Sequence, residues 1–366
     1  MLHADLIERV LPILGFLVCV TIIAELSDRI GVFSYLAHHA ARIARGSVPA
    51  LWLLVVVLAT AATAVLSLDT TAVLLTPVVL ALAQRLNLSR HLFAFTTVWL
   101  ANTASLFLPV SNLTNLLALH PLEAMGVRAD ALGFLTLTWP AAVVSWLVTV
   151  VVLAVVFRRS LRGRYVLGPP PRVRYRGLLV LGIVVCAALG PALLAGVEVL
   201  LAAAVGAAAL VVGSLVVNRG LLDRRLLPWQ LVLGVFVLFA VIQLALNLGL
   251  GRLLAELGGQ GESWRALLRV AGLGAVASNL ANNLPSYLAL EVVAGTPIRM
   301  VALLVGVNSG PLITPWASLA TVLWAGRCRA AGVSVDWRRF ALLGVLLVVP
   351  LILLSVGALW VVGVAG

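Results

Sequence analysis

Two stretches of the sequence place hydrogen-bonding side chains inside otherwise apolar segments. NTASLFLPVSNLTNLL (102–117) and NSGPLITPWASLATVL (308–323) each combine Asn, Ser and Thr with Pro. Amides and hydroxyls offer donors and acceptors without fixed charge, which suits a neutral ligand that presents hydroxyl groups. Together with the stretch SNLANNLPS (278–286), they supply the predicted ligand contacts: Asn102, Thr103, Ser111, Asn112, Ser278, Asn282, Asn283, Asn308 and Ser309.

The two stretches are copies of one another at an offset of 206 residues. Asn102 matches Asn308, and Pro109 matches Pro315. A Pro removes a backbone donor and ends a helix, so Pro109, Pro315 and the neighbouring Gly310 predict a break in each copy. Gly274 and Gly310 are expected to give the breaks flexibility. The alternative is that the polar side chains only bridge packed helices, but such bridges would not recur at a fixed offset.

Asp69 is the acidic residue at the centre of an apolar run, in SLDTT (67–71). A carboxylate buried there is costly unless it pairs with a cation or takes up a proton, which predicts a role in proton coupling. A carboxylate that caps the following helix is compatible with that role. Glu25 and Asp28, beside Arg29, are instead interpreted as surface ion-pair partners.

Composition indicates an all-α integral membrane protein. Hydrophobic residues make up 63% of the 366 residues, charged residues make up 10%, and the mean hydropathy is +1.15. Two runs, 48–84 and 264–294, predict helical hairpins that dip into the membrane and return, and two more, 92–119 and 298–325, predict discontinuous helices. With these, about eight full crossings are expected, the uninterrupted ones near 10–27, 133–157, 177–195, 197–217, 229–247 and 340–363.

The repeats divide the chain into two halves around a linker. Residues 1–157 and 226–366 are predicted to be repeats, and 158–225 to be a cytoplasmic linker with two connecting spans. Glu25 with Gly31 matches Gln243 with Gly249. Five crossings separate equivalent spans, so the repeats are predicted to be inverted. Most of the 25 basic residues, which are all Arg, then fall on the cytoplasmic side, so both termini are expected on the other side. The expected location is the cell membrane (plasma or inner), which the chain crosses several times.

Several classes of protein are excluded or disfavoured. No HExxH, GxSxG, Walker A or GxGxxG motif is present, so an enzyme is not expected, and uphill transport needs an ion gradient or a separate ATPase subunit. The arginines lie in short links, which disfavours nucleic acid and makes 157–177 a linker with incidental lipid contact. His38 and His39 are interpreted as surface residues. Cys19, Cys186 and Cys328 are core residues or, as an alternative, a three-thiolate metalloid site.

The quoted stretches, with LPWQLVL (227–233), resemble the arsenite and antimonite efflux permeases of the ion transporter superfamily, from about residue 10 to the C-terminus. The resemblance implies proton-coupled export of metalloid hydroxides by an inverted-repeat fold, while sodium-coupled dicarboxylate relatives tend to form elevator-type dimers. It also implies that about two N-terminal spans are missing here. The family often has Asp at Asn102 and Asn308 and Lys at Leu312, which leaves Asp69 for proton coupling.

Three functions follow as expectations. The first is export of arsenite or antimonite as neutral hydroxides in exchange for protons, with no cofactor beyond the ion gradient. The second is a sodium- or proton-coupled symporter for di- or tricarboxylates or another anion held by helix N-termini. The third is a non-transporting receptor or interaction protein. Loss of the matched breaks would indicate this function, and both breaks are present. Expected partners are the small substrate, the lipid bilayer, a second copy in a homodimer and a cytoplasmic ATPase subunit.

Overall fold

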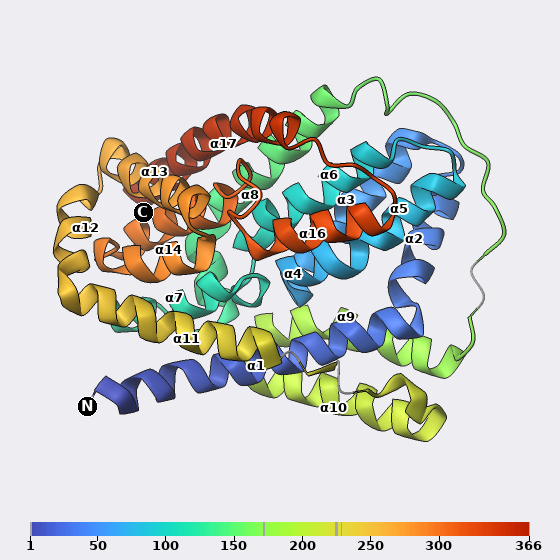
Figure 1. Cartoon of the computed structure of the whole chain (residues 1–366), viewed down its shortest axis with the longest axis horizontal. Helices are drawn as coiled ribbons and strands as arrows, with labels where there is room; N and C mark the ends of the chain where they lie inside the picture. The colour runs from blue at the N-terminus through green and yellow to red at the C-terminus, as the bar shows by residue number, and fades with distance from the viewer. Residues whose placement is uncertain (1, 171–172, 224–225, 228, 366) are drawn as a thin grey trace.

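The computed structural model describes residues 2–170, 173–223, 226–227 and 229–365, and these residues form helices joined mostly by short links, with a longer loop between α8 and α9 (Figure 1). The first nine are α1 (Leu2–Ile30), α2 (Val32–Ile43), α3 (Val48–Leu66), α4 (Leu68–Thr70), α5 (Thr76–Arg85), α6 (Arg90–Thr103), α7 (Leu113–Ala124), α8 (Ala131–Val156) and α9 (Arg176–Leu194). The others are α10 (Val199–Val217), α11 (Trp229–Ala245), α12 (Gly251–Gly258), α13 (Trp264–Leu280), α14 (Asn283–Leu290), α15 (Pro297–Leu304), α16 (Leu319–Ala330) and α17 (Trp337–Ala365). The predicted all-α class is confirmed.

Six helices in the described part of the chain are long and apolar enough to cross a membrane. Four of them, α8, α9, α10 and α17, fall on spans predicted from the sequence. The other two are the arms of the predicted hairpin 48–84, namely α3 and the continuous helix Leu68–Arg85, with 19 and 18 residues. Both arms are longer than predicted, because the polar break SLDTT lies at the centre of one apolar run in the sequence. The chain is a multi-pass membrane protein.

Buried apolar side chains form two clusters that divide the helices into two groups. The larger cluster lies among α3, α5, α6, α8, α13, α15, α16 and α17. The smaller one lies mainly among α1, α9 and α10, which pack on one another along one side of the molecule (Figure 1). Residues from α3, α7 and the first break, including Leu66, Leu108 and Leu116, complete the smaller cluster. The three-helix layer therefore packs against the body that contains the breaks.

Both predicted discontinuous helices are interrupted. In the first, α6 ends at Thr103, two 3-10 turns follow, and α7 begins at Leu113. In the second, α15 continues as a π-helical turn to Ser309, and α16 begins only at Leu319. A further match between the halves lies at Gly31 and Gly249, which both have left-handed backbone, with φ of 94° and 106°. The side chain of Gln243 lies outside the described residues.

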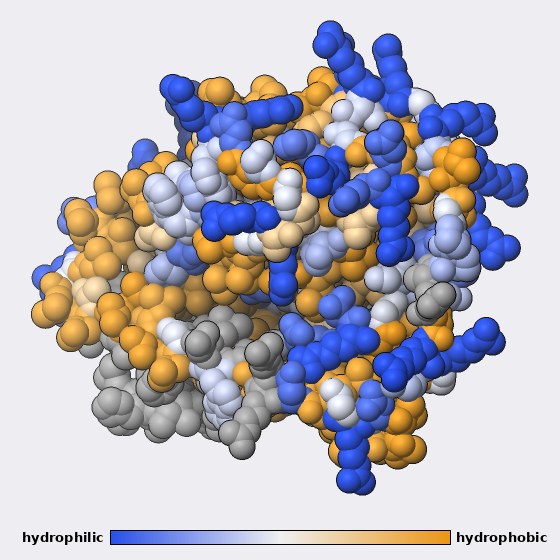
Figure 2. Space-filling model, turned by 45° about the vertical axis from the view of Figure 1, so that its right-hand side comes forward, coloured by the Kyte–Doolittle hydropathy of each residue, from blue (hydrophilic) through white to orange (hydrophobic). Residues whose placement is uncertain are grey.

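Long hydrophilic side chains gather along the right-hand and upper rim of the face shown in Figure 2, while the rest of that face is mostly hydrophobic. The arginines of α2, of the 157–170 loop and at the start of α9 are exposed. Arg172, Arg224 and Arg225, which the sequence analysis placed on the cytoplasmic side, lie outside the described residues. The polar rim and apolar surface are the pattern expected of a chain embedded in lipid.

Candidate functional site

The tips of both hairpins meet both helix breaks at one small cavity of about 90 Å³. We call it the break cavity. Its lining residues are Leu68, Asp69, Asn112, Leu113, Leu238, Asn282, Asn283, Leu284 and Leu319. Of the predicted ligand contacts and the proton-coupling residue, Asp69, Asn112, Asn282 and Asn283 come together here, although they are as far apart as residues 69 and 283.

Four helices begin at the wall of the break cavity, and each has a capping side chain. Ser67, Asn112, Asn282 and Ser318 each accept a hydrogen bond from a backbone N–H in the first turn, at 3.1–3.3 Å. The helices that follow start at Leu68, Leu113, Asn283 and Leu319, all of which line the cavity. A helix N-terminus carries a partial positive charge of roughly half an elementary charge. The four starts therefore make the cavity electropositive before any side-chain charge is counted.

Asp69 supplies a carboxyl group to this electropositive cavity. It is the second residue of its helix, in the first turn after the Ser67 cap, where an anionic side chain is favoured. Ser67 itself has φ of 126°, a conformation that side chains rarely adopt and that is often found at functional sites. The Oδ1 atom of Asp69 is buried and has no hydrogen-bond partner among the described residues. That oxygen is available to a proton or to a hydroxyl group of a bound molecule.

Asn308 joins the second break to the first. Its Oδ1 accepts from Asn112 Nδ2 at 2.9 Å and from Thr114 Oγ1 at 2.6 Å, and its Nδ2 donates to Asn115 Oδ1 at 2.6 Å. All four side chains are buried. Asn308 does not line the break cavity, but it holds the cavity residue Asn112 in place. It is a positioning residue in this structure.

Two asparagines satisfy the backbone groups that the breaks leave free. Asn115 donates from Nδ2 to the carbonyls of Ser105 and Leu108 in the first break. Asn279 accepts at Oδ1 from the N–H groups of Ile313 and Thr314 and donates to the Gly310 carbonyl in the second break. Its backbone carbonyl also accepts from Thr314 Oγ1 and Trp316 Nε1. Unpaired backbone groups are costly in an apolar environment, so these side chains make the breaks stable.

Asn115 was predicted as a partner for the unwound backbone of 102–117 and not as a ligand contact, whereas Asn279 was not predicted at all. The signals were present: Asn115 matches the polar Thr321 at the offset of 206, and Asn279 lies within the quoted SNLANNLPS. Both residues are positioned by long-range contacts that a local pattern does not contain.

Five other predicted ligand contacts lie away from the cavity lining. Asn102 and Ser278 donate to carbonyls four residues earlier on their own helices, at Val98 and Gly274. The remaining three make contacts between elements: Thr103 with Thr149, Ser309 with Ser145, and Ser111 with the Ala64 carbonyl. Their hydroxyls therefore hold α8 and α3 against the breaks, which is the bridging role that the sequence analysis kept as an alternative.

The predicted break residues act partly through close packing. Pro109 opens a 3-10 turn, and Pro315 lies in the non-helical segment between Ser309 and α16. Gly310 has an ordinary helical φ of −70°, but a Cβ there would lie 2.2 Å from the Gly306 carbonyl oxygen and 2.6 Å from Ala275. A Cβ on Gly274 would also be close to the π-helical turn. These glycines allow α13 to approach the second break closely, and the flexibility expected of them stays a prediction.

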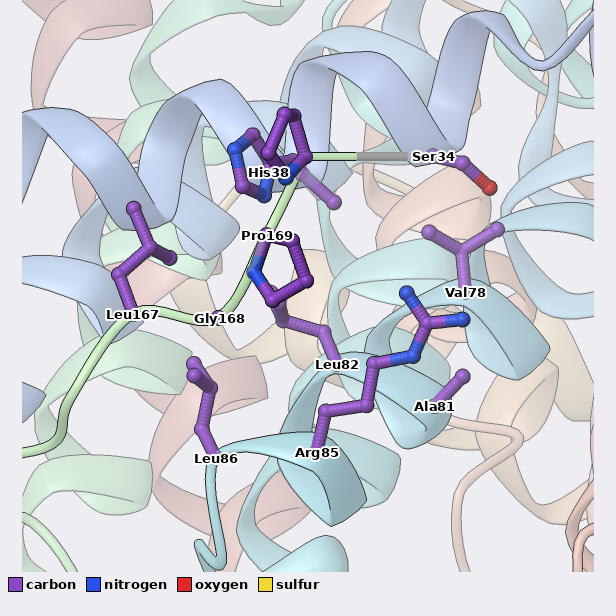
Figure 3. Close-up of a pocket in the computed structure, with 12 residues that line it drawn as sticks. Ser34, His38, Val78, Ala81, Leu82, Arg85, Leu86, Leu167, Gly168 and Pro169 are labelled. Atoms are coloured by element: carbon purple, nitrogen blue, oxygen red, sulfur yellow. The ribbon is translucent and has the colours of Figure 1, made fainter. Parts of the chain in front are cut away.

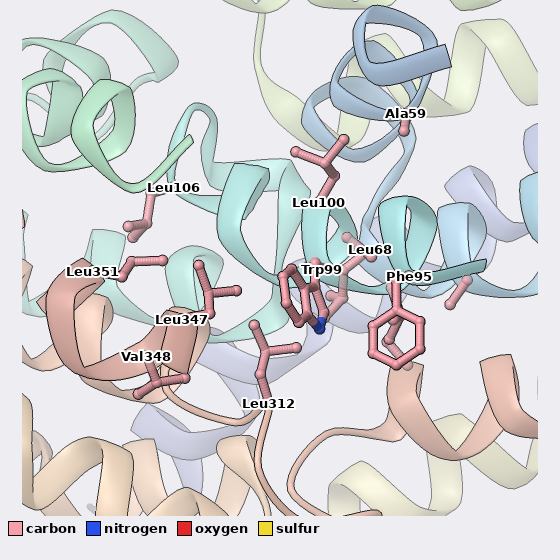
Figure 4. Close-up of a cluster of buried hydrophobic side chains, with 14 of the residues drawn as sticks. Ala59, Leu68, Phe95, Trp99, Leu100, Leu106, Leu312, Leu347, Val348 and Leu351 are labelled. Atoms are coloured by element: carbon pink, nitrogen blue, oxygen red, sulfur yellow. The ribbon is translucent and has the colours of Figure 1, made fainter. Parts of the chain in front are cut away.

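Leu312 is fully buried and packs near Trp99, Leu347 and Leu351 in an apolar cluster (Figure 4). No three His, Cys, Asp or Glu side chains of the described residues gather in a way that would hold a metal ion. The three-thiolate alternative is therefore wrong, because Cys328 is buried in one cluster while Cys186 contacts Ser27 in the other.

The helical membrane fold and the break cavity define the chain as a membrane transporter. It belongs to the citrate transporter family, whose model matches residues 7–326. The resemblance inferred from the sequence is confirmed: the chain is 30% identical to an arsenical pump membrane protein of Escherichia coli, over 93% of this chain and 84% of that protein. It is 28% identical to the arsenical pump membrane protein of Yersinia enterocolitica, with the same coverage. The YdaH transporter of Alcanivorax borkumensis has a similar fold, with a TM-score of 0.61 at 17% identity, covering 100% of this chain and 89% of that one.

Proposed function

We propose that this protein is a secondary active transporter that exports arsenite and antimonite as neutral hydroxides in exchange for protons, by alternating access. The break cavity carries the proposal, because it brings the free carboxyl oxygen of Asp69 to three asparagines and four helix starts. The similarity to arsenical pump membrane proteins supports the substrate. The coupling ion in this proposal is H⁺, and no resident cofactor is needed.

Size and polarity favour a small neutral substrate in this cavity. The cavity has a volume of about 90 Å³, which is small beside the roughly 300–1,000 Å³ of pockets for drug-sized ligands. A compact metalloid trihydroxide suits this volume better than a tricarboxylate does. Hydroxyl groups would donate to Asp69 and accept from asparagine amides, so each polar group would find a partner.

The proposed architecture is a pair of inverted repeats with about eight crossings, two re-entrant hairpins and both termini outside the cell. The matching elements support it: α1 and α2 correspond to α11 and α12 around Gly31 and Gly249, and each break is followed by a capped helix. In this scheme the hairpins and breaks move together against the layer of α1, α9 and α10. Alternating access in such folds works by movement of one unit around a fixed site. A homodimer is part of the proposal.

A second candidate is symport of an organic anion with protons or sodium. The four helix N-termini favour it, because they attract negative charge without any Arg in the breaks. Membership of the citrate transporter family points the same way. The cavity would then have to open to admit the anion.

Transport into proteoliposomes with an imposed proton gradient tests the proposal. We expect gradient-driven arsenite uptake by the wild-type protein and its loss in Asp69→Asn, because the amide cannot exchange a proton. Asp130→Asn is the matched control, since Asp130 caps α8 at Gly133 and does not line the break cavity. Citrate movement without arsenite movement would refute the first candidate and support the second. Equal activity of Asp69→Asn and wild type would refute the role of Asp69.

A further inference from the structure

Two cavities lie on either side of the described end of the 157–170 loop. They measure about 540 and 680 Å³ and share His38, Leu167, Gly168 and Pro170. Figure 3 shows the first, with Leu167, Gly168 and Pro169 crossing between α2, which carries His38, and α5, which carries Arg85. We call the two cavities together the loop groove.

The loop is fastened to α2 by hydrogen bonds. Tyr165 donates from its hydroxyl to the Ala41 carbonyl at 2.6 Å and from its N–H to the Gly46 carbonyl at 2.9 Å. Ser47 and Arg164 form an antiparallel bridge beside it. These contacts fix residues 164 and 165 beside the C-terminal end of α2, directly before the loop residues that line the groove.

The polar side chains around the loop groove include three arginines and two histidines. Arg85 lines the first cavity, Arg42 and Arg176 line the second, and the described lining residues of both include no carboxylate. Burial lowers the pKa of His38, and the positive charges of Arg42 and Arg85 nearby lower it further. His39 also lines the second cavity, and its Nδ1 is buried without a hydrogen-bond partner in the described part of the chain. The groove is therefore positive and has polar groups left for a ligand.

The second cavity continues onto an apolar surface. Val180 lines the cavity and is 61% exposed, and Val184, one turn further along α9, is 55% exposed. Helix α9 has the length and composition of a membrane span, so these valines face lipid in a multi-pass protein. A free inorganic anion would make no favourable contact with this apolar surface, whereas the acyl chains of a lipid would cover it.

We propose that the loop groove binds the phosphate head group of an anionic phospholipid, with Arg42 and Arg176 as its partners and the acyl chains lying along Val180 and Val184. Two guanidinium groups match the phosphate oxygens and remain charged at every physiological pH. The site is separate from the break cavity and does not depend on which substrate is transported. It replaces the expectation of an incidental lipid contact with a discrete site.

Native mass spectrometry of the purified protein, with phosphatidylglycerol and phosphatidylcholine at equal concentrations, tests this site. We expect one phosphatidylglycerol to bind preferentially to each chain. Arg42→Gln with Arg176→Gln should weaken that binding by about fivefold for each arginine removed, or about twenty-five-fold together. Arg329→Gln with Arg338→Gln is the control, because it removes the same charge from two exposed arginines that do not line the groove.

The outcomes separate a discrete site from general attraction. Retained binding in Arg42→Lys with Arg176→Lys, together with unchanged elution in size-exclusion chromatography, would show that lost charge and not misfolding explains the Gln variants. Equal weakening in the control variant, or no preference for phosphatidylglycerol in the wild type, would overturn the proposal. Displacement of the lipid by an equal concentration of inorganic phosphate would assign the groove to a free anion and also overturn it.

Discussion

Replacing Asn308 by Ala removes the side chain that joins the two breaks, and its cost follows from three hydrogen bonds. Two are accepted from Asn112 and Thr114, and one is donated to Asn115. Hydrogen bonds between membrane helices contribute roughly 0.6 kcal/mol each on average and about 1.7 kcal/mol at most. Three lost bonds should therefore lower the free energy of unfolding by about 2–5 kcal/mol.

Asn102→Ala is the matched control, because Asn102 occupies the equivalent position in the first half and is also fully buried. Its Nδ2 donates only to the Val98 carbonyl of its own helix, and its Oδ1 has no described partner. The substitution removes the same volume but leaves no other side chain unpaired, so we expect a loss below about 1 kcal/mol.

Unfolding of both variants in mixed micelles, followed by tryptophan fluorescence as a function of denaturing detergent, measures the difference. A second readout is the melting temperature of the protein in lipid nanodiscs. Equal losses for the two variants would refute the reasoning, since burial and volume alone would then explain both. An Asn308→Ala protein as stable as the wild type would refute it as well.

Three further predictions each rest on the contacts of one residue. Arg299 donates to the backbone carbonyls of Val293, Gly258, Gly259 and Gly261. Arg299→Gln should therefore lower the free energy of unfolding by about 3 kcal/mol or more, which a lower melting temperature would show. Gly306→Ala would place a Cβ 2.1 Å from the Ala271 carbonyl oxygen and should destabilise the protein by about 1–3 kcal/mol or prevent its expression, whereas Gly272→Ala, with open space around it, should be tolerated. The N–H of Gly133 lowers the pKa of Asp130, with help from Arg128. The stability that this cap contributes is present above the unfolded pKa of about 3.9 and should be lost as the pH falls through the folded pKa. Melting curves of the wild-type protein should show this loss at low pH, and those of Asp130→Asn should not.

The breaks were predictable because their causes are local. Pro109 and Pro315 interrupt hydrogen bonding wherever they occur, and Asn or Ser caps at the following helix starts are short-range features. The length of the hairpin arms was not predictable in the same way. Asp69 and its neighbouring threonines made 67–71 look like a polar centre, whereas the chain continues as a helix from Leu68 to Arg85 and turns only at Ser67.

The candidate site was predictable as a set of residue types but not as a set of roles. Asn102 and Asn308 match at the offset of 206 residues, yet one bonds within its own helix and the other joins the two breaks. Which of them makes the long-range contact depends on how α7 packs against the second break, and no spacing in the sequence encodes that packing. Asn279 was missed for the same reason.

The charge balance of the break cavity connects the protonation of Asp69 to the kind of substrate. Four helix starts contribute together roughly +2 elementary charges, and an ionised Asp69 offsets about half of that. A proton on Asp69 would strengthen the attraction for an anion, so anion and proton would bind together and move in the same direction. For a neutral hydroxide the electrostatic attraction of the cavity changes little when Asp69 takes up a proton. Such a substrate instead needs the ionised oxygen as a hydrogen-bond acceptor, so substrate and proton would compete for Asp69. Competition of this kind produces exchange, and Asp69→Asn would then abolish binding of arsenite while leaving binding of an anion intact.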